Sequence, residues 1–274
     1  MTIIQSIILG IVQGLTEFLP ISSSAHLVFV PYLLNWNIPA GQAFVFDVLV
    51  QVATLLAVIV YFWHDLVAIV KAVVNGLVKK APFADPTARL GWLILAATIP
   101  AGLAGLLLKN VVESAFGSPR ITALFMFVTA ALLVMAERVG KRTRTLDTLN
   151  WKDAIWIGVF QAIAIFPGVS RSGSTISGGM TRNLERPAAA RFAFLMTIPI
   201  MLAAGLLASL DVIRTSDLES TLLIFIPGFI AAALTGYLAI RWLLRYLMQH
   251  TLYDFAIYCV ALGLFVLLVS FVRG

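Results

Sequence analysis

Long apolar runs alternate with short polar segments along most of the chain. A helix needs about 20 apolar residues to cross the hydrocarbon core of a bilayer. By this measure the pattern predicts spanning helices over approximately 44–63, 89–108, 120–137, 188–210, 221–244 and 252–272. We therefore expect an all-α polytopic membrane protein with six full transmembrane helices.

Two other apolar runs are too short to cross and stop at a proline. Residues 1–34 contain one that stops at Pro20, and residues 153–185 contain one that stops at Pro167. Two short helices around a polar break predict a re-entrant helical hairpin. Such irregular backbone is tolerated at membrane depth only where it is buried in protein or lines a wet cavity.

The two hairpins belong to a repeated unit. The segment G-I-V-Q-G-L from Gly10 aligns with G-V-F-Q-A-I from Gly158, an offset of 158 − 10 = 148 residues. A hairpin followed by three spans thus occurs twice within a single membrane domain, over approximately 1–140 and 150–274. Because each unit has an odd number of spans, we expect an inverted-topology repeat whose hairpins enter from opposite faces and meet near the midplane.

Composition agrees with this interpretation. Of the 274 residues, 61% are hydrophobic and 12% are charged, which excludes an ordinary soluble domain. The net charge of +6 is interpreted as a bias of cytoplasmic loops, and nucleic acid is not expected as a partner. Cys259, the one cysteine, cannot form an internal disulfide. No basic segment precedes the first apolar run, so we expect no removable signal peptide.

Loop charges predict the orientation in the membrane. One set of loops is rich in lysine and arginine, and it contains Lys71, Lys79, Lys80, Arg138, Lys141, Arg142, Arg144, Lys152, Arg182, Arg186 and Arg245. The opposite loops are mixed, with Lys109, Arg120 and Arg214 against Glu113, Asp211, Asp217 and Glu219. Since basic loops stay inside, the first set should be cytoplasmic. Both termini and the opening of the first hairpin should then face outward, to the periplasm.

The first hairpin carries polar groups that could act on a substrate. Gln13 and Glu17 are four residues apart and so share one helix face, where they could hold a metal ion or polarise a substrate group. The alternative is a packing glutamine and a glutamate that caps the break. A carboxylate at bilayer depth costs several kcal/mol, which favours a functional role.

Three serines and a histidine follow Pro20. They are Ser22, Ser23, Ser24 and His26. A serine on the first turn of the second short helix could be a nucleophile with His26 as its base, close to backbone amides that attract anions. Serine N-capping alone would also explain one of the hydroxyls.

The second hairpin has the composition of a phosphate-binding loop. Its small and hydroxylated residues surround one guanidinium, and they include Gly168, Ser170, Arg171, Ser172, Gly173, Ser174 and Thr175. Arginine binds two phosphate oxygens in a planar fork while amides and hydroxyls take the others. The alternative is that Arg171 pairs with Glu17 or extends to the cytoplasmic surface. No H-E-x-x-H or G-x-x-x-x-G-K-[ST] motif is present.

Together these motifs resemble the undecaprenyl pyrophosphate phosphatase family of the bacitracin-resistance type, along essentially the whole chain. The matching segments are [E/Q]-x-x-x-E at Gln13 and Glu17, P-x-S-S-x-x-H from Pro20 to His26, and P-G-x-S-R-S-x-x-T from Pro167 to Thr175. The resemblance implies a hydrolase of the bacterial plasma (inner) membrane. It would remove the terminal phosphate of undecaprenyl diphosphate to recycle the lipid carrier for peptidoglycan synthesis.

The resemblance also implies roles for individual residues. The catalytic group would be Glu17, Ser23, His26 and Arg171, with Ser22, Gly168, Ser170, Ser172 and Thr175 binding substrate. Glu17 and Gln13 would hold Mg²⁺ or Ca²⁺, although glutamine at position 13 removes one negative ligand. Ala25 stands where a glycine is common.

Partners and the competing function follow from the same resemblance and the repeat. Bacitracin would act on the diphosphate lipid rather than on the protein, and a homodimer is left open. Since inverted repeats are typical of transporters, a polyprenyl-phosphate flippase, with or without phosphatase activity, is the alternative.

Overall fold

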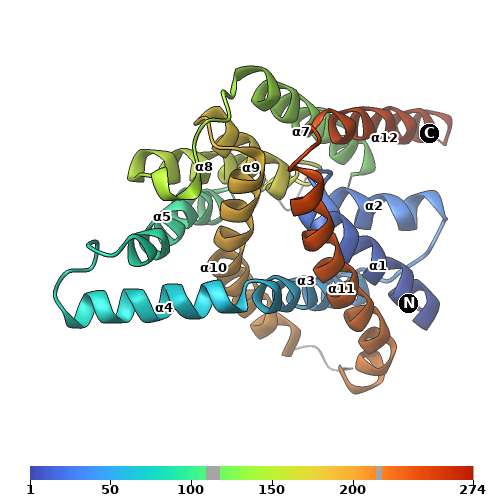
Figure 1. The fold of residues 1–274 in the computed structure, drawn as a ribbon. Helices are drawn as coiled ribbons and strands as arrows, with labels where there is room; N and C mark the ends of the chain where they lie inside the picture. The colour runs from blue at the N-terminus through green and yellow to red at the C-terminus, as the bar shows by residue number, and fades with distance from the viewer. Residues whose placement is uncertain (109–117, 214–217, 274) are drawn as a thin grey trace.

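The computed structural model describes residues 1–108, 118–213 and 218–273, without the side chains of 207–222. Within these ranges the chain forms eleven α-helices, one short 3-10 helix and no sheet (Figure 1). Six charged residues of the mixed loops, on which the predicted orientation partly rests, lie outside the described positions or have no described side chain. They are Lys109, Glu113, Asp211, Arg214, Asp217 and Glu219.

In the part of the chain that the structure describes, six helices are long and apolar enough to cross a membrane, as the sequence predicted. They are α3 (Ala40–Tyr61), α5 (Pro86–Leu107), α7 (Pro119–Val139), α10 (Arg186–Ile213), α11 (Leu218–Tyr246) and α12 (Tyr253–Val272). Local chemistry sets where some begin. The carboxylate of Asp85 accepts from the amides of Thr87 and Ala88 at the start of α5, and Pro86 occupies the first turn. The protein is therefore a multi-pass membrane protein.

Four shorter helices lie where the hairpins were expected. The first pair is α1 (Ile3–Phe18) and α2 (Ser23–Leu33), and the second is α8 (Trp151–Ile163) and α9 (Arg171–Thr181). Capping boxes start α1 at Thr2 and α8 at Asn150. Serines 22 and 170 cap α2 and α9.

The first helix of each hairpin packs against a long helix of the other half, α1 on α11 and α8 on α5. Glycines make both contacts possible. A Cβ at Gly10 would lie 2.1 Å from the carbonyl oxygen of Gly228, and a Cβ at Gly158 would lie 2.5 Å from that of Ala97. Small residues let helix backbones approach closely in membranes. Gly10 and Gly158, which are 148 residues apart, thus allow the same kind of close helix contact, one in each half of the chain.

One helix was not expected. The segment α4 (Trp63–Val78) lies between α3 and α5, where the sequence analysis placed only a loop. It packs on α5 and extends along the lower left edge of Figure 1. At 16 residues it is too short to cross, and its apolar positions form a stripe rather than a continuous run, so a search for long apolar runs misses it.

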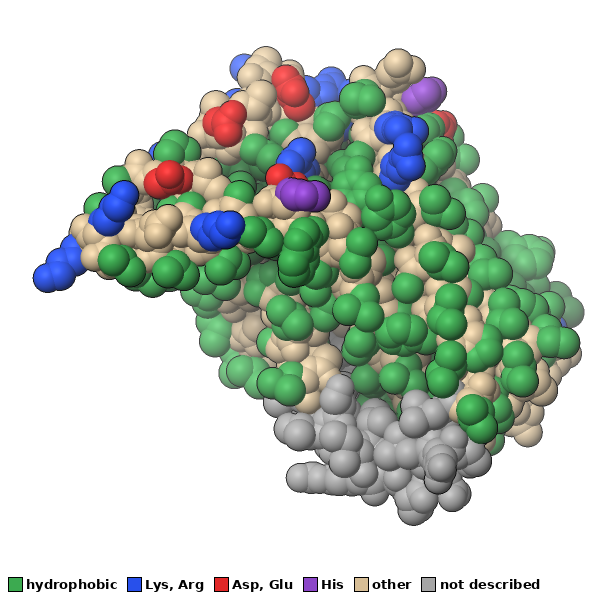
Figure 2. Space-filling view, turned by 60° about the horizontal axis from the view of Figure 1, so that its bottom comes forward, with side chains coloured by type: hydrophobic (Ala, Val, Ile, Leu, Met, Phe, Trp, Pro, Cys, Tyr) green, Lys and Arg blue, Asp and Glu red, His purple; other side chains and the backbone are tan. Residues whose placement is uncertain are grey.

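Basic loops gather at one end of the molecule around two buried carboxylates. Glu137 accepts hydrogen bonds from Arg142 and Arg186 at 2.5–2.7 Å, and Asp153 accepts from Arg144 and Arg182 at 2.7–3.3 Å. Figure 2 shows charged side chains along the upper edge and the arm at the left, above a broad hydrophobic surface.

Both termini lie at the other end of the bundle. The amino group of Met1 donates to Gln42 near the start of α3, and Arg273 donates to the carbonyls of Tyr32 and Leu33 at the end of α2. The amide of Leu252, at the start of α12, bonds Glu137 at the charged end. Helix α12 therefore runs from the charged end to the termini, about 30 Å at 1.5 Å per residue.

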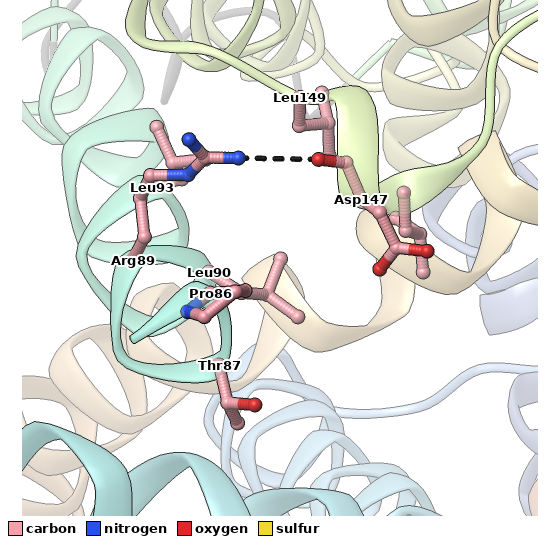
Figure 3. A pocket seen from close by; sticks show the side chains of 8 residues that line it. Pro86, Thr87, Arg89, Leu90, Leu93, Asp147 and Leu149 are labelled. Carbon is pink, nitrogen blue, oxygen red and sulfur yellow. Dashed lines mark hydrogen bonds between the residues drawn. The ribbon is translucent and has the colours of Figure 1, made fainter. Parts of the chain in front are cut away.

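A hollow opens between the start of α5 and the 3-10 helix η1 (Leu146–Thr148), as Figure 3 shows. Arg89 reaches across it to the carbonyl oxygen of Asp147 at 3.1 Å. None of the candidate site residues lines this hollow.

Candidate functional site

Glu17 is the point where the two hairpins meet. It lies in the last turn of α1, and its Oε2 accepts from Gln13 Nε2 at 2.9 Å and from the Ser23 hydroxyl at 2.5 Å. Its Oε1 forms an ion pair with Arg171 of the second hairpin. The carboxylate side chain is only 6% exposed. One buried anion therefore gathers a hydroxyl, an amide and a guanidinium from both halves of the chain.

The two hairpin breaks are bonded to each other. The hydroxyl of Ser24 accepts from the Gly168 amide at 3.3 Å, and that of Ser172 donates to the Leu19 carbonyl at 2.9 Å. Gly168 has a φ of +96°, and a Cβ there would lie 2.1 Å from the Thr122 carbonyl oxygen, so only glycine fits. These contacts hold the first turns of α2 and α9 next to one another.

The starts of α2 and α9 are built alike. Ser22 accepts from the Ala25 amide and pairs with the Ser24 hydroxyl at 3.1 Å. Ser170 accepts from the Gly173 amide and pairs with the Ser172 hydroxyl, also at 3.1 Å. The offset between the two capping serines is 170 − 22 = 148, the offset of the sequence repeat. Ser23 and Arg171 therefore hold equivalent places, the first residue of each helix.

This arrangement is suited to an anion. Unpaired amides and the helix dipole make a helix N-terminus attractive to phosphate. Here two such termini, each in an 11-residue helix, lie beside a guanidinium and a hydroxyl. Arg171 is paired with Glu17, and a phosphate, which carries more negative charge than a carboxylate, could replace Glu17 as the partner of the guanidinium. The site can thus bind a phosphate and offer it a serine hydroxyl or a water.

His26 does not bond Ser23 in the described contacts. Its Nδ1 lies 2.7 Å from the Ser22 carbonyl oxygen, and its Nε2 lies 2.7 Å from the Tyr258 hydroxyl. His26 follows Ser23 by three residues and shares its helix face, so the two side chains are neighbours on α2. The assignment of His26 as a base remains a prediction.

The side chain of Thr175 forms hydrogen bonds within its own helix, α9. Its hydroxyl donates to the carbonyls of Arg171 and Ser172 at 2.8 and 3.2 Å. The substrate-binding role given to Thr175 also remains a prediction.

The residues at the site suit a divalent cation that substrate helps to hold. Among the described residues there is no cluster of three or more His, Cys, Asp or Glu that could bind a metal alone. Gln13 Oε1, however, is buried without a hydrogen-bond partner, and it lies on the residue that bonds Glu17. An amide oxygen, a carboxylate and substrate phosphates are oxygen ligands of the kind that Mg²⁺ and Ca²⁺ take.

Sequence reasoning missed two residues that support the site. The Thr129 hydroxyl of α7 accepts from the Ser170 amide at 2.8 Å and donates to the Gly168 carbonyl at 3.0 Å, which fixes the second break. Tyr258 of α12 bonds His26. Each is a hydroxyl inside an apolar span, and that is the one signal the sequence offers.

The fold and the site define a class. This is a multi-pass membrane protein in which two broken hairpins bring helix N-termini, serines and an arginine–carboxylate pair to one buried point suited to phosphate.

Comparison with known proteins gives the particular family. The chain belongs to the family described as bacitracin resistance protein BacA, whose profile matches residues 6–265. It is 44% identical to an undecaprenyl-diphosphatase of Thermomicrobium roseum, and the alignment covers 100% of both chains. A relative with the same description from Chlorobaculum tepidum is 46% identical, and the alignment covers 96% of this chain and 95% of the relative. In Myxococcus xanthus the identity is 40%, covering 97% and 89%.

Proposed function

We propose that this chain is an undecaprenyl-diphosphatase, which hydrolyses undecaprenyl diphosphate to undecaprenyl phosphate and inorganic phosphate. Full-length similarity to relatives of that description supports the proposal. The structural observation that carries it is Glu17, which bonds both Ser23 and Arg171 across the two hairpins. The reaction would return the lipid carrier to peptidoglycan synthesis and so confer resistance to bacitracin, which binds the diphosphate form.

The proposed chemistry begins with exchange of the Arg171 partner. The diphosphate takes the guanidinium from Glu17, and the first-turn amides of α2 and α9 bind the terminal phosphate. Ser23 Oγ attacks the terminal phosphorus, its proton passes to the Glu17 carboxylate that it already bonds, and undecaprenyl phosphate leaves. Water then cleaves the phosphoserine with His26 relaying the proton. Positioning and charge stabilisation supply most of the catalysis in phosphoryl transfer.

Direct attack by water, with Ser23 as a hydrogen-bond donor, is the alternative route. The two routes differ in stereochemistry at the transferred phosphorus. Two successive displacements retain its configuration, whereas one displacement inverts it. A substrate with a chiral terminal phosphate therefore distinguishes them, and inversion would contradict the phosphoserine.

A divalent cation is part of the proposal. Gln13 and the Glu17 oxygen that Arg171 releases would hold Mg²⁺ or Ca²⁺ together with the substrate phosphates, while the other Glu17 oxygen takes the Ser23 proton; the ion would neutralise charge on the leaving group. A chelator should abolish phosphate release and added Mg²⁺ or Ca²⁺ should restore it. The Gln13→Ala variant should need more of the ion for half-maximal activity than the unaltered protein.

The central test is phosphate release by the purified protein in detergent from undecaprenyl diphosphate or a shorter prenyl diphosphate. Glu17→Ala and Arg171→Ala should each lower the rate at least a hundredfold, because each removes a group that touches the substrate or Ser23. Arg191→Ala is the matched control, since Arg191 also pairs with a carboxylate, Asp65, but at an exposed position. Undiminished activity in the first two variants would contradict the site.

We also propose the inverted-repeat architecture, with two re-entrant hairpins and a site open to the periplasm. The paired contacts of α1 with α11 and α8 with α5 support it, as do the matched caps of α2 and α9. This same symmetry favours lipid transport as a second candidate function. A Ser23→Ala protein in vesicles that moves a fluorescent prenyl phosphate between leaflets, without hydrolysis, would support it.

A further inference from the structure

His26 has both ring nitrogens engaged, and the partners define its tautomer. A backbone carbonyl only accepts, so Nδ1, which lies 2.7 Å from the Ser22 carbonyl oxygen, must carry the hydrogen. In a neutral ring Nε2 is then an acceptor, and it receives the Tyr258 hydroxyl at 2.7 Å. His26 is 7% exposed, so water supplies neither bond easily.

Tyr258 reaches this place from the other end of the chain. The planes of the His26 and Tyr258 rings are 6° apart and their centroids are separated by 5.7 Å. The next residue, Cys259, directs its thiol to the Pro20 carbonyl at 3.9 Å, so α12 is fixed at the break of the first hairpin. Tyr258 itself is 41% exposed. The Tyr258 hydroxyl is therefore positioned by its hydrogen bond to His26 and by the contact of α12 with the first hairpin, while the tyrosine side chain stays partly exposed.

The second hairpin has no equivalent of this contact. The position equivalent to His26 is 26 + 148 = 174, a serine. The Ser174 hydroxyl is buried and has no partner among the described residues. The tyrosine contact thus occurs in the half that carries Glu17 and Ser23, which is not expected of a contact that serves the repeated architecture alone.

We propose that Tyr258 is a positioning residue for His26. Its hydroxyl holds the imidazole in the tautomer with hydrogen on Nδ1 and in a fixed direction, until the proton that His26 relays displaces the tyrosine hydroxyl from the Nε2 lone pair. Without the hydroxyl, Nε2 is left buried and unpaired, which favours rotation of the ring or a change of tautomer. The effect on catalysis rests on the proposed function, in which His26 relays a proton.

The kinetic test uses Tyr258→Phe, which keeps the ring that stacks on His26 and removes only the hydroxyl. General acid–base groups contribute roughly 10²–10⁴-fold to rates, so a misdirected His26 should lower kcat about tenfold or more with little change in KM. The matched control is Tyr253→Phe, which removes a hydroxyl from the first turn of the same helix and should leave kcat unchanged.

A double-mutant cycle separates positioning from direct substrate contact. In a His26→Ala background, Tyr258→Phe should cause no further loss of kcat, because Tyr258 acts through His26. An equal fold loss in both backgrounds would overturn the proposal.

A second measurement needs no activity. In protein labelled with ¹⁵N-histidine, the His26 signals are identified by their disappearance in His26→Gln. The unaltered protein should show hydrogen on Nδ1. Tyr258→Phe should move the Nε2 signal and populate the other tautomer, whereas Tyr253→Phe should not. An unchanged His26 spectrum in Tyr258→Phe overturns the proposal. If the spectrum changes but the unaltered protein releases no phosphate, the proposed function fails and the positioning of His26 stands.

Discussion

At the scale of single residues, Glu17 determines how Arg171 is paired in the structure. The sequence left three interpretations of Arg171 open, a phosphate ligand, the partner of Glu17 and a side chain that extends to the cytoplasmic surface, and the structure has the ion pair. A role as phosphate ligand is compatible with this ion pair if the pair is the resting arrangement. A buried charge needs a partner, and Glu17 keeps Arg171 paired until an anionic substrate replaces it.

The neighbouring serines provide a prediction with a built-in comparison. Ser23 bonds Glu17, whereas Ser24 bonds the Gly168 amide. Ser23→Ala should reduce phosphate release by at least a hundredfold, because it removes the proposed nucleophile, and should hardly change the melting temperature. Ser24→Ala should lower stability by about 1 kcal/mol, since it leaves an amide without its acceptor, and should retain more activity than Ser23→Ala. Equal activity of the two variants would contradict the assignment.

At the scale of helices, close backbone contact explains where glycine is required. Gly10 faces the Gly228 carbonyl on α11, whereas a Cβ added at Gly102 of α5 would have no neighbouring atom within 4 Å. Gly10→Ala should cost about 1–3 kcal/mol because the overpacked helices must separate. Gly102→Ala should stabilise by up to about 1 kcal/mol through helix propensity. Thermal unfolding in detergent compares the two, and a neutral Gly10→Ala would contradict the packing of α1 on α11.

The buried carboxylate at the start of α8 gives a prediction about pH. Burial opposes ionisation of Asp153, but hydrogen bonds from Arg144 and Arg182 outweigh it and hold the pKa of Asp153 below its usual value. Such a group adds stability above its unfolded pKa, and this stability is lost as the pH falls through the folded pKa. Asp153→Asn should therefore cost about 1–3 kcal/mol at neutral pH, since it removes the charged acceptor of Arg144 and Arg182, whose side chains are 25% and 40% exposed.

Melting temperatures across pH provide the check. The difference between Asp153→Asn and the unaltered protein should be full at neutral pH and should shrink below about pH 4, the range in which an ordinary aspartate becomes protonated. A difference that stays constant down to acidic pH would show that the carboxylate charge does not hold this end together.

Helix α4 illustrates why one element escaped prediction. Its buried residue Ile69 faces Gly91 of α5, while Trp63 and Val74 form an exposed apolar stripe and Lys71 is exposed on a third side. A helix with three different faces has no long apolar run, although it has a clear helical period. Helical periodicity would have identified it where average hydropathy did not.

At the scale of the whole molecule, the two ends of the bundle differ in charge, and orientation follows from that difference. Basic loops surround Glu137 and Asp153 at one end, and the termini lie at the other. By the positive-inside rule the charged end should be cytoplasmic.

Labelling of single cysteines tests this orientation in a Cys259→Ala background. In intact cells an impermeant thiol reagent should modify Thr2→Cys from outside and should reach Lys79→Cys only after the membrane is opened. The reverse pattern would place the site opening at the cytoplasmic face and would contradict the proposed topology.

Much of the fold was predictable because it depends on local properties. The six spans and both hairpin breaks follow from run length, proline and hydroxyl content, which are read directly along the chain. The chemical group at Glu17, Ser23 and Arg171 was recognisable as a set of motifs. Its bonding was not, because the three-residue spacing favoured His26 as the partner of Ser23, whereas the break at Pro20 brings the serine hydroxyl to Glu17, six residues earlier.

By itself the sequence determined the class of protein, the number of candidate spans and the residues that could bind phosphate, because each of these depends on composition and on spacing over a few turns, and its motifs resembled those of the family. Tertiary structure decided which groups touch. Arg171 meets Glu17 across 154 residues and Tyr258 meets His26 across 232. Contacts so distant in sequence depend on how helices of the two halves pack, and no local pattern records that packing.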